Sequence, residues 1–82
     1  MINSISAPSV YYQGYFSDDN INHYDFITLD DLLKYAQDRN VERVTVYQIW
    51  AYNTHNEYVR FGDYVPDKTR IQGYRLDKGV IA

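Results

Sequence analysis

The sequence predicts an α+β fold, a two-layer domain in which one helix packs on one face of an antiparallel sheet of about four strands. Two patterns support this prediction. Apolar side chains recur at helical spacing at Leu29, Leu32, Leu33 and Ala36, which gives a helix with a single apolar face. The segments on both sides of that helix are rich in Val, Ile, Tyr and Trp, which favour strands. Because an apolar helix face needs a partner surface, we expect the strands to form one sheet against it.

The helix is predicted within Ile27–Asn40, and both of its ends carry sequence signals. Thr28 is the expected N-cap, because its hydroxyl can accept a hydrogen bond from the backbone amide of Asp31. Asp31 also lies at the positive end of the helix dipole, and Arg39 lies at the negative end. Asn40 tolerates the left-handed conformation that commonly ends a helix.

The predicted strands are Ser9–Phe16, Val41–Tyr52, Tyr58–Val65 and Arg70–Leu76. The helix follows the first of them, so the order is strand, helix, strand, strand, strand. Both alternating sets of residues in the second strand contain apolar side chains, which indicates a central strand. Two placements are open for the first strand. It lies parallel beside the central strand, with the helix as a right-handed crossover, or it forms a hairpin with part of Asp18–Phe26.

The 82 residues are expected to form a single domain, residues 1–82, with a loose arm at residues 1–8. A hydrophobic fraction of 45% and an aromatic fraction of 17% are too high for a disordered chain. The absence of cysteine excludes disulfides and thiolate metal sites, and it fits a reducing cytoplasm. The sequence contains neither a long apolar run nor the basic start of a secretory signal. We therefore expect a cytoplasmic protein without a membrane partner.

The residues that usually carry catalysis are not arranged for it. The two histidines, His23 and His55, lie far apart in turn-like segments, which does not favour a metal site. The adjacent acids at Asp18–Asp19 and Asp30–Asp31 are better explained by turn formation and by the helix dipole than by acid–base chemistry. The serines lack an activating histidine, and the glycines are too scattered for a phosphate loop. We expect no catalytic residue, no metal, no cofactor and no enzyme activity.

Ten tyrosines are the outstanding feature of the composition. Aromatic side chains on an open sheet face can anchor a protein partner or stack on unpaired bases. The candidate nucleic-acid face consists of Tyr47, Trp50, Tyr58 and Arg60. The net charge of −3 favours a protein partner over nucleic acid.

The first third of the chain, residues 1–31, is acidic and carries no Lys or Arg. Its candidate partner-binding residues are Asp18, Asp19, Asp25, Asp30 and Asp31, together with Tyr11, Tyr15 and Tyr24. A rigid negative patch beside tyrosines can occupy the basic groove of a nucleic-acid-binding protein and speed the association. The alternative is a solvated acidic surface that keeps a small protein soluble.

In size, acidity, tyrosine content, lack of cysteine and helix-plus-sheet plan, the chain resembles the small inhibitor proteins of bacteriophages and mobile elements, which include anti-CRISPR and anti-restriction proteins. This resemblance implies a non-enzymatic protein that binds and blocks a host protein that handles nucleic acid. Two alternatives come from other classes. One is a single-stranded nucleic-acid-binding module with a tyrosine-rich sheet face. The other is a homodimer or self-assembling structural protein in which Arg70–Leu76 pairs with its copy.

Overall fold

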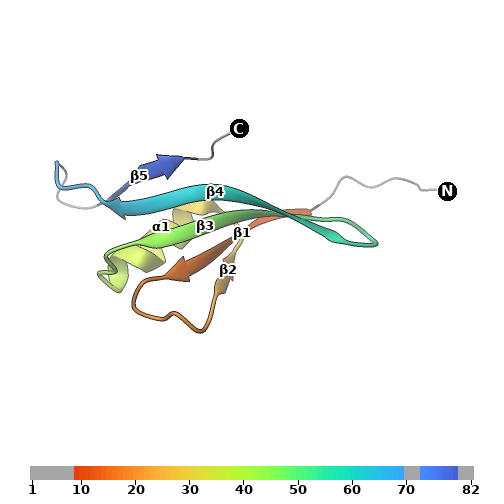
Figure 1. The fold of residues 1–82 in the computed structure, drawn as a ribbon, viewed down its shortest axis with the longest axis horizontal. Coiled ribbons are helices and arrows are strands. Elements are labelled where there is room, and N and C mark those ends of the chain that lie inside the picture. Colours follow the sequence, from red (N-terminus) through yellow and green to blue (C-terminus); the bar gives the residue numbers. More distant parts are fainter. Residues whose placement is uncertain (1–8, 70–72, 80–82) are drawn as a thin grey trace.

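The computed structural model describes residues 9–69 and 73–79, which form a five-stranded antiparallel sheet and one helix (Figure 1). In chain order the elements are β1 (Ser9–Phe16), β2 (Tyr24–Phe26), α1 (Leu29–Asp38), β3 (Val44–Ala51), β4 (Asn56–Pro66) and β5 (Tyr74–Gly79). Their spatial order is β2-β1-β3-β4-β5, and every neighbouring pair is antiparallel. The predicted α+β class is confirmed, but the sheet has five strands instead of about four.

The additional strand is β2, which is three residues long. It forms a hairpin with β1, in which Tyr12 lies opposite Phe26 and Gly14 lies opposite Tyr24. On its other edge β1 pairs with β3 over its full length, and this pairing is antiparallel. The hairpin alternative is therefore present, and a parallel first strand beside the central strand is wrong. The physical reason is that the β1–β2 turn reverses the chain before α1 carries it across β1 to β3.

The other strands differ from their predicted bounds at the ends. β3 is shorter than Val41–Tyr52, because Val41 still belongs to the turn that ends the helix. β4 extends beyond Tyr58–Val65 at both ends. It starts earlier because the hairpin closes tightly where the amide of Tyr52 donates to the carbonyl of His55 at 2.8 Å, and it reaches Pro66, which lies opposite Tyr74 of β5. The predicted strand Arg70–Leu76 lies partly outside the described residues, and β5 continues beyond it.

The core lies between the apolar stripe of α1 and one side of the sheet. Its buried cluster consists of Phe16, Leu32, Ala36, Val41, Val44, Val46 and Tyr64. Leu32 and Ala36 of α1 are completely inaccessible to solvent, with 0% exposure. In the strand register Phe16 lies opposite Val44, so both side chains share the sheet side that contacts the helix. We call this surface the helix side of the sheet and the opposite surface the open side.

Local hydrogen bonds at both ends of α1 explain why the helix begins and ends where it does. The amide of Asp31 donates to the hydroxyl of Thr28 at 3.1 Å, which confirms the predicted N-cap. At the other end Asn40 adopts a φ of 56°, the left-handed conformation expected from its sequence position. This turn brings the amide of Val41 to the carbonyl of Ala36 at 3.2 Å and buries the Val41 side chain in the core.

Gly14 is the position where added volume should disturb this core most directly. A Cβ there would come within 3.0 Å of ring atoms of Phe16 and 3.2 Å of Cδ1 of Leu32. We predict that Gly14→Ala lowers the free energy of unfolding by about 1–3 kcal/mol through overpacking, as measured by urea denaturation. In a Phe16→Leu background the same substitution should cost less, because the crowding ring atoms are gone. An equal cost in both backgrounds contradicts the steric explanation.

Candidate interaction surface

Strand alternation and register gather aromatic residues on the open side of the sheet. β1 contributes Tyr11 and Tyr15, and β3 and β4 contribute Tyr47 and Tyr58. In the register Tyr11 and Tyr58 lie on either side of Ile49, which occupies the middle strand. We call the surface formed by Tyr11, Tyr15, Tyr47 and Tyr58 the tyrosine face.

Ile49 anchors one end of the tyrosine face. Its side chain has 0% exposure, although it lies on the side of the sheet away from α1. Directly opposed side chains on one sheet face are nearest neighbours, so Tyr11 and Tyr58 cover Ile49. Burial raises the pKa of Tyr11 above its ordinary value, and the nearby Asp25 carboxylate and Tyr58 add smaller effects. The face is therefore a packed layer above the sheet.

Ring contacts hold the other end of the tyrosine face. Tyr15 makes an edge-to-face contact with Tyr47, with ring centroids 5.8 Å apart and an interplanar angle of 75°. The ring of His23 lies 5.3 Å from that of Tyr15. Even so, Tyr15 is 40% exposed and Tyr58 is 58% exposed. Aromatic side chains that are both held in place and accessible suit protein contacts, because they lose little conformational freedom on binding.

Charged side chains border the tyrosine face along β4. Nη2 of Arg60 lies 2.8 Å from Oδ1 of Asp63, and Nη1 of Arg43 lies 3.3 Å from Oδ2 of the same carboxylate. Asp63 is only 8% exposed, so the two guanidinium groups compensate a largely buried negative charge. Arg43 also lies 3.4 Å from Asp77. Because these arginines are balanced by neighbouring carboxylates, the border is not a basic patch.

The structure does not bring the five predicted aspartates into one acidic patch. Asp18 lies at the C-terminal end of α1, where Nη2 of Arg39 approaches its carboxylate to 2.8 Å. Asp30 and Asp31 lie at the N-terminal end of the same helix. A helix of ten residues is about 15 Å long, which exceeds the distance over which exposed charges act together. Asp25 lies apart from both groups, on β2.

Asp19 has a local structural role in the β1–β2 turn. Its Oδ1 accepts hydrogen bonds from the amides of Ile21 and Asn22, each at 3.1 Å. Its Oδ2 accepts one from the hydroxyl of Tyr24, also at 3.1 Å. Tyr24 lies on the helix side, with its ring centroid 5.9 Å from that of Phe16. Neither Asp19 nor Tyr24 therefore belongs to the open side.

The candidate nucleic-acid residues are also divided between the two sides of the sheet. Tyr47, Tyr58 and Arg60 share the open side, whereas Trp50 lies on the helix side. Nε1 of Trp50 donates to Oε1 of Gln48 at 2.9 Å, and this contact turns the indole along β3.

Along the sequence, the tyrosines of the open side fall into two different candidate sites. Tyr11 and Tyr15 belong to the predicted partner-binding set with the aspartates, and Tyr47 and Tyr58 belong to the candidate nucleic-acid face. Alternation sorts the residues within each strand, but only the register between β1 and β3 shows that these sets share one side.

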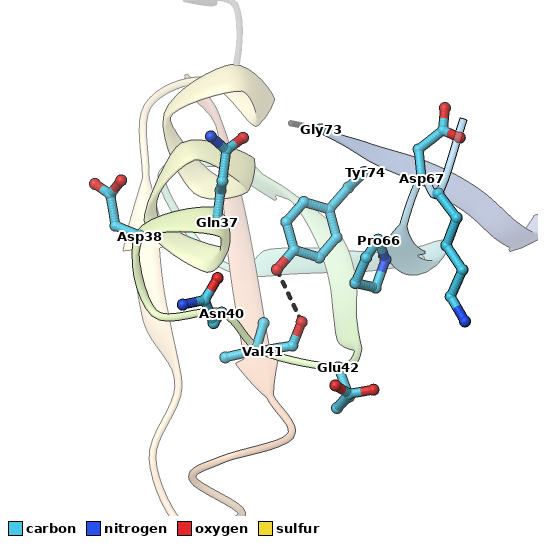
Figure 2. A pocket seen from close by; sticks show the side chains of 10 residues that line it. Gln37, Asp38, Asn40, Val41, Glu42, Pro66, Asp67, Gly73 and Tyr74 are labelled. Atoms are coloured by element: carbon cyan, nitrogen blue, oxygen red, sulfur yellow. Dashed lines mark hydrogen bonds between the residues drawn. The ribbon is translucent and has the colours of Figure 1, made fainter. Parts of the chain in front are cut away.

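A hollow of about 500 Å³ lies between the C-terminal end of α1 and the adjoining ends of β4 and β5 (Figure 2). The hydroxyl of Tyr74 donates to the carbonyls of Val41 at 2.8 Å and Ala36 at 3.0 Å at its inner wall. Burial raises the pKa of Tyr74 above its ordinary value. Asp38 and Glu42 line the hollow with other polar residues. These hydrogen bonds attach β5 to the helix end, which is a structural role.

Within residues 9–69 and 73–79, no group of three or more histidine or acidic side chains is arranged to hold a metal ion. The same part of the chain contains no helix with the length and apolar character needed to span a membrane.

No protein-family model, curated protein sequence or solved structure matches the chain significantly.

The Asp19 carboxylate predicts a specific pH dependence of stability. Its pKa is lowered from 3.8 to about 2, chiefly because the amide and the side chain of Asn22 donate hydrogen bonds to it. Because the folded pKa is lower than the unfolded one, the stabilisation is present above about pH 4 and is lost as the pH falls toward 2. We predict that the difference in unfolding free energy between wild type and Asp19→Asn shrinks over this range, as measured by urea unfolding. The deficit of Thr28→Ala, a cap without a titrating group, should stay constant. A constant Asp19→Asn deficit contradicts the assignment.

Proposed function

We propose that this chain is a non-enzymatic interaction protein that binds another protein through the tyrosine face. The observation that carries the proposal is the presence of four tyrosines from three neighbouring strands on one side of the sheet, two of them well exposed. Tyrosine is enriched among the residues that dominate binding energy at protein interfaces, because its ring buries a large area and its hydroxyl keeps a polar partner. The balanced charges along β4 suit a protein surface better than a phosphate backbone.

A second part of the proposal concerns the identity of the partner. We infer a host protein that handles nucleic acid, blocked by this chain in the manner of a phage-type inhibitor. Its support is the small size, the net charge of −3 and the resemblance to such inhibitors. Since the aspartates lie apart, the tyrosine face provides the main contact, and the acidic residues act through the overall field that steers association.

A second candidate is binding of single-stranded nucleic acid by the same face. It is favoured by the position of Tyr47 and Tyr58 beside Arg60, since aromatic rings can stack on bases while a guanidinium contacts phosphate. The pairing of Arg60 with Asp63 weighs against it. A labelled oligonucleotide that binds at low salt and is released by added salt would favour this second function.

Affinity capture with matched variants tests the proposal. We predict that the partner retained by the wild type is lost with Tyr15→Thr/Tyr58→Thr, with the dissociation constant raised at least about tenfold, because two exposed anchors are removed. Tyr52→Thr is the matched control, since Tyr52 is 38% exposed and lies at the β3–β4 hairpin, outside the tyrosine face. Circular dichroism should show that all variants remain folded.

The same experiment includes Asp30→Asn/Asp31→Asn, which removes charge without changing the tyrosine face. This variant should retain the partner with a slower association. Retention by the double tyrosine variant together with loss by the aspartate variant would show that the acidic residues, and not the tyrosines, form the contact.

A further inference from the structure

β5 forms an edge of the sheet, because β4 is its one strand neighbour in the described part of the chain (Figure 1). The amide of Asp67 donates to the carbonyl of Gly73 at 3.0 Å, so the carbonyl of Gly73, the residue before β5, points toward the β4 side. In an antiparallel pair this direction alternates from residue to residue. The backbone N–H and C=O groups of Arg75 therefore also point toward β4. Those of Tyr74 and Leu76 point to the outer edge of the sheet.

The residue opposite Tyr74 agrees with this assignment. Pro66 has no amide hydrogen, so it fits opposite a residue whose backbone groups face away from β4. Outward N–H and C=O groups are the means by which an edge strand adds a further strand. β5 thus offers a template for an extended segment, with Leu76 at its middle and 46% exposed.

The charged residues on either side of Leu76 indicate which kind of segment the edge of β5 can pair with. Arg75 precedes it and Asp77 follows it, and Nη1 of Arg75 lies 3.7 Å from Oδ1 of Asp77, so both charges lie on one side of the strand. When such a segment pairs antiparallel with its own copy around Leu76, each arginine lies opposite the aspartate of the other copy.

We propose that β5 pairs antiparallel with β5 of a second copy of this chain, with Leu76 directly opposite Leu76. The outward groups of Leu76 form reciprocal hydrogen bonds, and two Arg75–Asp77 pairs flank them. The proposal goes beyond the proposed function and uses an edge that the tyrosine face does not include. The two sheets become continuous, and the two tyrosine faces lie on the same side, so that a partner with two sites gains avidity.

A bulge at Asp77 shortens the regular edge of β5, because Tyr64 pairs with Leu76 and Asp63 with Lys78. The shared ladder is therefore short, and the dimer is expected to form at high protein concentration and to dissociate on dilution.

Sedimentation velocity over a concentration series up to about 1 mM tests the proposal. We expect the wild type to show a dilution-dependent dimer and Leu76→Pro to remain a monomer. Proline removes the outward donor without removing a hydrogen bond to β4. Arg75→Asp alone and Asp77→Arg alone should also remain monomers, because each places like charges opposite one another. A mixture of these two charge variants should form a heterodimer, since both cross-strand pairs are then complementary.

Lys34→Asp is the matched control, because it changes the net charge as Arg75→Asp does, at an exposed position of α1 outside β5. It should dimerise like the wild type, and circular dichroism should show all variants folded. A wild-type monomer throughout the series, a dimer that survives Leu76→Pro, or a mixture of charge variants that stays monomeric would each overturn the proposal.

Discussion

The packing of Leu32 against β1 at Gly14 is the contact on which the rest of the structure depends. Leu32 is fully buried, and a Cβ on Gly14 would crowd its Cδ1 at 3.2 Å, so the missing side chain lets the helix approach the sheet closely. Once this contact sets the side of β1 that faces α1, alternation assigns every other residue of β1 to the open side. The register with β3 extends that assignment across the sheet, and the Tyr74 hydrogen bonds attach β5 to the end of the helix.

The composition of the open side depends on the core, because the strand residues that alternate with the core residues point to the open side. Ile49 alternates with the buried valines of β3, and the tyrosines beside it shield it from water while they remain partly exposed. The acidic residues serve mainly local purposes. Asp19 closes a turn, Asp18 pairs with Arg39, and Asp63 is compensated by two arginines. A small chain with a negative net charge can therefore present an aromatic surface in place of an acidic one.

Much of the fold could be predicted from the sequence, and the misses have physical causes. The bounds of β1 and the N-cap of α1 agree with the structure, because they depend on strand propensity and on a hydrogen bond between residues three apart. A hairpin of the first strand with part of Asp18–Phe26 was one of two open placements, but the bounds of β2 could not be predicted, because three residues are too few for a periodic pattern and the pairing with β1 stabilises them. By position along the chain, Tyr47 and Trp50 belong to one candidate site, whereas Tyr11 and Tyr58 belong to different ones. In the structure, alternation along β3 places Trp50 and Tyr47 on opposite sides of the sheet, and the register of β3 with β1 and β4 places Tyr11 and Tyr58 on the same side.

The sequence by itself determined the features that depend on neighbouring residues: the apolar stripe and the capped ends of α1, the strand character of β1, β3 and β4, and the α+β class. Only the tertiary structure decided which residues of different strands face the same way. That decision requires the pairing between strands far apart in the chain, and a shift of one residue in that pairing would turn every side chain of a strand to the other side of the sheet. The tyrosine face and the outward groups of β5 are consequences of register, and no local pattern encodes them.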